Sequence, residues 1–294
     1  MSQLLQSLVD ALSQGAVLGL AALAIGLVFG VIRLANFANG ELITAAGYSL
    51  IFTWQFGWYV AIPLSILVAV GLSLLMEFAV FSRMRTASPA TLLIASFGLS
   101  FLLQRVYELL FTNNVQTAAV APELAQSIEI GGVRLQLLSV TAIVLAVVLL
   151  IALQWFLTRT TLGLQLKAAA ADFRTARLVG ISAGRVIGMS FVLSGILAAV
   201  VGFVLTVQSG AVGPTFGVRI TILALVGAVI GGIDKISGSL AGGFLVGFVT
   251  SLLASWLPQE MSNFKDAYVF VLVIIVLLIR PQGLLIKGRG VART

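Results

Sequence analysis

The polar residues that interrupt long apolar runs are the ones that could do chemistry in this chain. Asn36, Asn39 and Glu41 lie between two apolar stretches, next to the helix-breaking Gly40. Amide and carboxylate groups are costly in lipid unless they face protein or water, so these side chains predict the wall of a cavity or a translocation pathway. A capping role is an equal alternative, with Asn39 as the N-cap and Glu41 in the first turn of the following helix.

A second interruption covers residues 208–217 and holds Gln208 and Thr215 among Gly and Pro residues. It precedes a short apolar piece, as the first interruption does, which predicts a second broken helix on the same pathway. The two interruptions follow spans of opposite direction. Such an arrangement is typical of an inverted-repeat transporter, so we take an inverted repeat as a hypothesis.

Missing residue types exclude most other chemistry. The chain has no Cys and no His, which removes disulfides, thiolate nucleophiles, His-ligated metals and Ser-His-Asp triads. No lysine follows a glycine, so the G-x-x-x-x-G-K-[ST] phosphate loop is absent from the sequence. We therefore expect a protein that is not an enzyme, with no metal or cofactor of its own. If ATP drives it, another subunit binds the ATP.

Segment 158–185 is the third candidate functional region. Four successive alanines followed by Gly180 predict a short amphipathic helix with a glycine stop. The small alanine side chains on one face of this helix would let another protein approach its backbone closely. Charged residues beside them would orient the contact. The alternative is an interfacial helix that rests on anionic headgroups. The candidate contact residues are Ala168, Asp172, Arg174, Ala176, Arg177 and Gly180.

The elements that position these residues follow from composition. Of the 294 residues, 60% are hydrophobic and only 9% are charged, against about 25% charged in soluble domains. We predict an all-α polytopic transmembrane bundle of about nine spans that forms one domain over 1–294. The longer spans are expected at 8–32, 59–82, 90–111, 137–157, 186–208, 238–256 and 267–280. Short, broken or re-entrant pieces are expected at 41–53 and 218–233.

Basic residues set the predicted orientation. Most Arg and Lys lie in the loop after the second long span, in segment 158–185 and in the tail 281–294, which marks these regions as cytoplasmic. These cytoplasmic basic residues account for the net charge of +7, so we expect no nucleic acid as a partner. We expect the chain to be embedded in membrane lipid. Segment 112–136 is then an external loop, whose residues 127–136 alternate around Gly-Gly and predict a hairpin.

Two further patterns predict structure only. Glycines recur four residues apart, for example at Gly15/Gly19 and Gly243/Gly247, and favour close helix packing. Arg105 and Glu108 are three residues apart on one span and should form an ion pair.

Three stretches resemble the smaller permease subunit of branched-chain amino acid ABC importers, a family that also includes urea and short-chain amide importers. Residues 36–41 are similar to the family's N-F-A-H-G-E, and residues 168–181 to its A-x-x-x-D-x-x-x-A-x-x-x-G-I. Residues 280–284 resemble its closing R-P-x-G. The resemblance covers nearly the whole chain. Asn39 departs from it, because the family usually has His there.

This resemblance implies a permease subunit that passes a small polar solute, such as a branched-chain or other hydrophobic amino acid, urea or a short amide. The location implied is the bacterial or archaeal cytoplasmic (inner) membrane. The implied partners are a second related permease in a heterodimer, two ATPases that bind ATP and Mg, and an external substrate-binding protein. Residues 168–181 would be the coupling helix that docks in an ATPase groove. The alternative is a stand-alone secondary transporter or channel, which would need ionisable groups within its spans.

Overall fold

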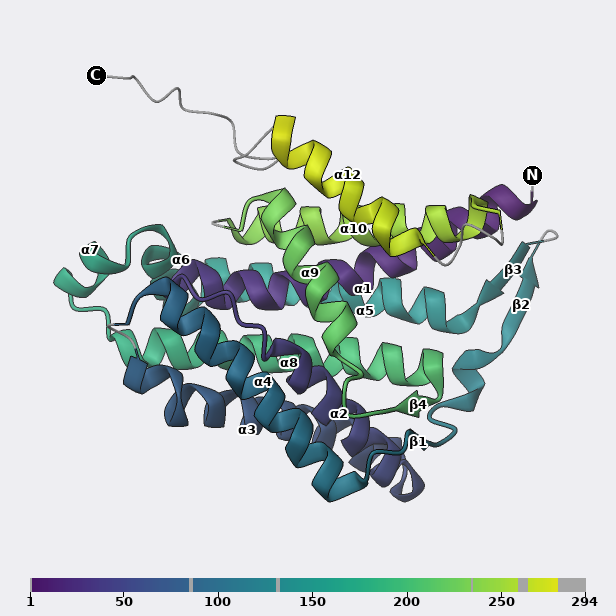
Figure 1. Cartoon of the computed structure of the whole chain (residues 1–294), viewed down its shortest axis with the longest axis horizontal. Helices are drawn as coiled ribbons and strands as arrows, with labels where there is room; N and C mark the ends of the chain where they lie inside the picture. The colour runs from purple at the N-terminus through teal and green to yellow at the C-terminus, as the bar shows by residue number, and fades with distance from the viewer. Residues whose placement is uncertain (1, 85–86, 131–132, 234, 259–263, 280–294) are drawn as a thin grey trace.

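The computed structural model describes residues 2–84, 87–130, 133–233, 235–258 and 264–279. It is a bundle of helices with two short antiparallel strand pairs (Figure 1). Six of the described helices are long and apolar enough to cross a membrane, which confirms a polytopic helical bundle. They are α1 (Ser2–Ile32), α3 (Trp58–Ala79), α4 (Pro89–Phe111), α5 (Leu137–Arg159), α8 (Ala183–Ser209) and α10 (Ile236–Trp256). The predicted basic tail, 281–294, lies outside the described residues.

Three shorter apolar helices account for the other predicted pieces. The two broken pieces are α2 (Asn39–Thr53) and α9 (Val218–Gly231), each of which follows a non-helical stretch. Their lengths of 15 and 14 residues are below the roughly 20 that a full crossing needs. The piece expected as a full span at 267–280 is α12 (Lys265–Ile279), also only 15 residues long.

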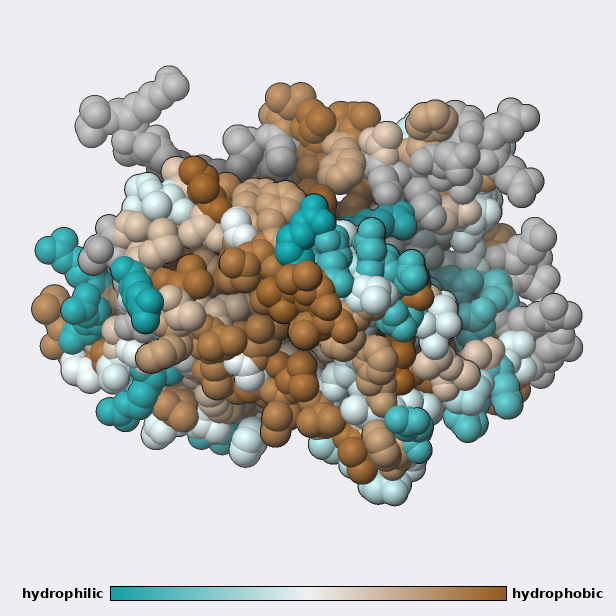
Figure 2. Space-filling view, turned by 60° about the horizontal axis from the view of Figure 1, so that its bottom comes forward, coloured by the Kyte–Doolittle hydropathy of each residue, from teal (hydrophilic) through white to brown (hydrophobic). Residues whose placement is uncertain are grey.

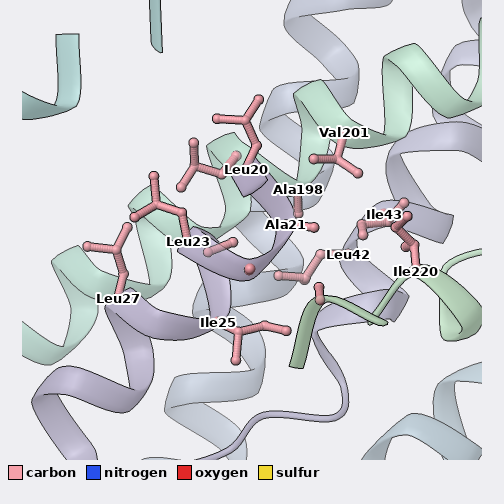
Figure 3. Close-up of a cluster of buried hydrophobic side chains, with 14 of the residues drawn as sticks. Leu20, Ala21, Leu23, Ile25, Leu27, Leu42, Ile43, Ala198, Val201 and Ile220 are labelled. Carbon is pink, nitrogen blue, oxygen red and sulfur yellow. The ribbon is translucent and has the colours of Figure 1, made fainter. Parts of the chain in front are cut away.

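Helix α1 lies at the centre of the bundle. Its most apolar window is 83% buried, against 22% for α4 and α5, so α1 is covered by protein on nearly all sides. Figure 3 shows buried side chains of α1, such as Leu23 and Ile25, in one cluster with Leu42 of α2, Val201 of α8 and Ile220 of α9. The core therefore forms where α1 meets α2, α8 and α9.

The outer helices expose large hydrophobic side chains. Leu67 of α3, Ile94 of α4 and Ile151 of α5 are 67%, 70% and 64% exposed. Figure 2 shows one such face, where hydrophobic residues cover the middle and hydrophilic residues gather toward the two ends. Such a surface is stable in lipid or against another subunit and would be unfavourable in water.

Glycine pairs bring the central helices into backbone contact. A Cβ on Gly247 of α10 would lie 2.5 Å from the Gln14 carbonyl oxygen of α1. A Cβ on Gly227 of α9 would lie 2.6 Å from the Gly243 Cα of α10. Both distances are too short for any side chain larger than hydrogen, so the prediction of close helix packing is confirmed.

The helix contacts repeat in a symmetric way. Helix α1 packs against α9 and α10, while α8 packs against α2 and α3. Helices α2 and α3 contact each other, as α9 and α10 do. Exchanging α1, α2 and α3 for α8, α9 and α10 thus reproduces the pattern, and α1 and α8 run in opposite directions (Figure 1). These contacts support the hypothesis of an inverted repeat.

The connections distinguish the two ends of the bundle. At one end, β2 (Ser127–Ile130) and β3 (Val133–Gln136) form the predicted hairpin. At the other end lie α6 (Thr161–Ala171) and α7 (Phe173–Leu178) (Figure 1). The predicted ion pair between Arg105 and Glu108 is confirmed. Short 3-10 turns complete the connections at Trp54–Phe56, Phe81–Met84 and Pro122–Ala125.

One strand pairing was missed by the sequence analysis. Strand β1 (Gln116–Thr117), in the predicted external loop, pairs with β4 (Ala211–Val212), in the second polar interruption. The loop after α4 is therefore tied to the stretch that leads into α9.

Candidate functional site

The two polar interruptions meet where α2 and α9 begin. A Cβ on Gly40 would lie 2.7 Å from the carbonyl oxygen of Gly217 and 2.6 Å from Thr221 Oγ1. Only glycine at these positions allows the two backbones to approach so closely. Because α2 and α9 both start here, the two half-helices present their amino-terminal ends to the same buried region.

A hydrogen bond between the half-helices fixes this crossing. Gly217 is the N-cap of α9 and has no side chain with which to cap the helix. Thr44 of α2 takes that role, because its Oγ1 accepts a hydrogen bond from the Gly217 N–H at 2.9 Å. The same hydroxyl donates to the Gly40 carbonyl oxygen at 3.1 Å. One threonine therefore joins the starts of both helices.

The crossing residues have a shared sequence pattern that the sequence analysis missed. Residues 40–44 read Gly-Glu-Leu-Ile-Thr, and residues 217–221 read Gly-Val-Arg-Ile-Thr. Both match G-x-x-I-T at the start of a half-helix. Comparing the two interruptions residue by residue would have found Gly217, Thr44 and Thr221.

The structure places Asn36, Asn39 and Glu41 inside the protein, at no more than 1% exposure each. Asn36 Oδ1 accepts a hydrogen bond from the Ala38 N–H at 3.1 Å, which shapes the turn before α2. Asn39 Oδ1 accepts from Ser194 Oγ of α8 at 2.8 Å. The second of these hydrogen bonds joins the start of α2 to α8. A role in the pathway stays a prediction for these residues.

Glu41 attaches α2 to α4. Its Oε1 accepts hydrogen bonds from Ser100 Oγ at 2.7 Å and from Gln104 Nε2 at 3.0 Å. The Tyr107 hydroxyl donates to the Glu41 carbonyl oxygen at 2.8 Å. Glu41 Oε2 and Asn39 Nδ2 are buried with no hydrogen-bond partner among the described residues. Unpaired buried polar atoms cost stability, so each needs an explanation such as a bound water molecule or a functional role.

Replacing Asn39 with Leu should lower the stability of the chain by about 1–3 kcal/mol, because the buried Ser194 hydroxyl loses its acceptor. The thermal unfolding midpoint of the purified protein measures this loss. Asn39→His is the matched control, since imidazole can still accept a hydrogen bond. A midpoint for Asn39→Leu equal to or above that of the wild type would contradict this prediction.

A polar cavity of about 580 Å³ lies at the end of the bundle that carries the hairpin. Asp10 of α1 and Arg219 of α9 both line it and bring opposite charges to one space. Gln208, predicted on the pathway, is among the lining residues, whereas Thr215 is exposed on the stretch before α9. The other polar lining residues are Ser13, Gln14, Gln136, Ser139, Ser209, Thr250, Ser251 and Ser255.

At the opposite end, segment 158–185 forms two helices, so the prediction of one short helix was wrong. The helix breaks at Asp172, whose backbone is extended and whose side chain caps α7. Asp172 Oδ1 accepts hydrogen bonds from the backbone N–H groups of Arg174 and Thr175 at 3.0 and 3.1 Å. An aspartate is more stable as an N-cap than within a helix, which explains the break.

This cap also responds to pH. The Thr175 hydroxyl and then its backbone amide hold the pKa of the Asp172 carboxyl below its ordinary value. A lowered pKa means that the ionised cap stabilises α7 at neutral pH. That contribution is lost only as the pH falls through the lowered pKa.

The break at Asp172 changes which residues can reach a partner. Ala176 is 4% exposed and packs inside the chain, so it is not part of an open contact face as predicted. Ala168, Arg174, Arg177 and Gly180 remain exposed.

The tip of α7 presents two side chains that the sequence analysis did not single out. Leu178 and Val179 are 82% and 73% exposed. Gly180, with φ of +87°, ends the helix as predicted. The Gly180 and Ile181 N–H groups donate to the carbonyl oxygens of Arg177 and Ala176, which is a Schellman motif.

Comparison with known proteins now decides the class of this protein. A family model described as "Branched-chain amino acid transport system / permease component" matches residues 7–279. The chain belongs to this family. The resemblance to this family is thereby confirmed, and the protein is a multi-pass membrane permease.

Individual relatives agree with the family assignment over nearly the full length. The permease is 29% identical to the high-affinity branched-chain amino acid transport system permease protein BraD of Pseudomonas aeruginosa, over 96% of this chain and 95% of BraD. LivH of Escherichia coli K12, with the same description, is 27% identical over the same shares. A probable branched-chain amino acid transport permease protein LivH of Methanocaldococcus jannaschii is 28% identical, over 90% and 87% of the two chains. These relatives are permease subunits and not enzymes.

A solved structure supports the fold. A chain of PsaBC from Streptococcus pneumoniae in complex with Fab matches with a TM-score of 0.52 and 12% identity. The match covers 93% of the permease and 91% of that chain. At this identity the similarity concerns the arrangement of helices alone.

Proposed function

We propose that this permease is a subunit of an ATP-driven importer that carries a branched-chain or similar hydrophobic amino acid across the bacterial or archaeal cytoplasmic membrane. The observation that carries the proposal is the contrast between the two ends of the bundle. One end has a polar cavity with both charges, and the other has an exposed apolar tip on α7. The first end is suited to a solute and the second to a protein partner.

The charges in the cavity support an amino acid over urea or an amide. A free amino acid carries an ammonium and a carboxylate, which Asp10 and Arg219 can attract. Urea and short amides are neutral and need only hydrogen bonds, which the Ser and Gln side chains of the cavity would supply without either charge. The presence of both charges therefore favours a zwitterion.

The α7 tip supports docking to an ATPase. A Leu and a Val that are largely exposed beside the basic Arg174 and Arg177 resemble the apolar centre and polar rim of a protein interface. With no G-x-x-x-x-G-K-[ST] loop in its sequence, the permease needs a separate subunit to bind ATP and Mg. The proposed assembly also contains a second, related permease and an external substrate-binding protein.

Purification of the tagged full-length permease from its native membrane tests this proposal. A nucleotide-hydrolysing subunit should co-purify in a fixed ratio with the permease, together with a second permease chain. Mass spectrometry of the purified complex identifies these subunits. A permease that purifies alone and transports alone would support the stand-alone transporter, which the family assignment does not favour.

A further inference from the structure

A second cavity of about 830 Å³ lies at the α6 and α7 end of the bundle. Its walls come from the ends of α1 and α5, from α6 and from the start of α10. Helix α6 packs against α1, α5 and α8, and the cavity lies between α6 and the start of α10. It is distinct from the polar cavity at the hairpin end.

Basic residues surround this cavity. Arg33 follows α1, Lys167 belongs to α6 and Lys235 precedes α10, and all three line it. None of the described residues that line it is acidic. Arg33 has φ of +55°, a backbone conformation that is uncommon for residues other than glycine, so the surrounding structure must hold it there. The charges of Lys167 and Lys235 therefore point to an anionic ligand.

The interior of the same cavity is apolar. Its lining is completed by hydrophobic side chains of α1, α5 and α10, together with Ala170 and Ala171 of α6 and the polar Gln154 and Ser237. The large apolar members are Leu23, Leu150, Leu153, Leu157, Ile236 and Leu240. A free phosphate would contact the basic residues but would leave this apolar surface uncovered. The ligand should therefore carry an anionic head and an apolar tail.

The cavity also adjoins a surface suited to lipid. Gln154 lines the cavity and lies on α5 between Ile151 and Trp155, which are 64% and 62% exposed. Trp is enriched at the level of lipid headgroups. A cavity lined by both basic and apolar side chains at this level matches the sites between helices that bind anionic lipid headgroups.

We propose that this cavity binds an anionic phospholipid of the cytoplasmic leaflet. Lys167 and Lys235 contact the phosphate of the headgroup, and an acyl chain lies along the leucine surface. The volume of this cavity lies within the range of about 300–1,000 Å³ that is typical of ligand-binding cavities. The bound lipid connects α6 to α1 and α10 and so steadies the segment that carries the α7 tip.

The test is native mass spectrometry of the permease, with the subunits that co-purify, after exchange into micelles containing phosphatidylglycerol or phosphatidylcholine. The wild type should retain phosphatidylglycerol in preference to phosphatidylcholine. Lys167→Gln/Lys235→Gln should weaken phosphatidylglycerol retention by about 25-fold, or roughly fivefold per lysine. Arg83→Gln/Arg185→Gln is the matched control, because it removes the same charge from exposed positions that do not line the cavity.

A second variant tests the apolar part without changing charge. Gln154→Trp should fill the cavity and lower lipid retention, whereas Val148→Trp on the exposed face of α5 should not. Three results would overturn the proposal. The first is equal retention of the two lipids, and the second is displacement of phosphatidylglycerol by millimolar inorganic phosphate. The third is a lysine variant that retains lipid as the wild type does but loses a co-purifying permease subunit. The last result would assign the cavity to a subunit interface.

Discussion

Replacing Leu178 and Val179 with Ser should release the ATPase from the permease and abolish uptake. These two side chains are 82% and 73% exposed at the tip of α7, and burial in a partner groove would remove most of that apolar surface from solvent. Burying a Val or Leu side chain stabilises a complex by about 1.5–3 kcal/mol. Losing both should weaken ATPase binding by at least about 100-fold. Co-purification of the ATPase and reconstituted uptake measure the two effects.

The control for this variant is Leu109→Ser/Leu110→Ser, at the opposite end of the bundle. Leu109 and Leu110 are 85% and 68% exposed near the end of α4, so the control removes a similar exposed apolar pair. It should leave ATPase binding unchanged. A Leu178→Ser/Val179→Ser permease that keeps both the ATPase and uptake would exclude the α7 tip as the docking site. Ala176→Trp is unsuited to this purpose, because Ala176 is buried and a larger side chain would disturb the chain itself.

Replacing Arg219 with Gln should lower leucine uptake by about 10–100-fold without releasing the ATPase. A hydrogen bond to a charged group contributes about 1.5–3 kcal/mol, and the Gln variant removes the cation that attracts the carboxylate of the solute. Asp10→Asn should act on the ammonium in the same direction. Initial rates of radiolabelled leucine uptake into proteoliposomes measure these losses.

Two further variants show whether charge is responsible for the loss of uptake. Arg219→Lys keeps the charge and should recover part of the uptake. Ser255→Ala removes one hydroxyl from the same cavity and should change uptake by less than about threefold, because a neutral hydrogen bond contributes about 1 kcal/mol or less. Wild-type uptake by Arg219→Gln and Asp10→Asn would show that this cavity does not bind the zwitterion.

Local sequence patterns predicted the local parts of this structure. Apolar runs placed the membrane helices, and the alternation around Gly-Gly placed the hairpin between β2 and β3. The spacing of Arg105 and Glu108 predicted their ion pair, and Gly180 marked the end of α7. In each case the residues that decide the structure lie within a few positions of one another.

The functional contacts were harder to predict because distant segments create them. Thr44 caps α9 across 173 residues of chain, and β1 pairs with β4 although α5 to α8 lie between them in sequence. Both cavities depend on helices that are far apart in sequence. The break at Asp172 is a different case. Its signal was local, but a helical interpretation of the alanine run hid the capping role of the aspartate.

The two ends of the permease are connected through its centre. Helix α9 carries Arg219 at the outer cavity and begins at Gly217, where it meets α2. Helix α8 leads from the connection after α7 to the stretch paired with β1. At the crossing of Gly40 and Gly217 the backbones of the two half-helices touch.

Leucine uptake into sealed proteoliposomes that contain the permease complex most directly tests whether this protein works as a subunit of an ATP-driven amino acid importer. With the substrate-binding protein present on the side of the hairpin, uptake should require ATP on the side of α7 and should stop when ATP is replaced by a non-hydrolysable analogue. Dissipating ion gradients should not change the rate. Uptake that persists without ATP and follows an ion gradient would contradict this function.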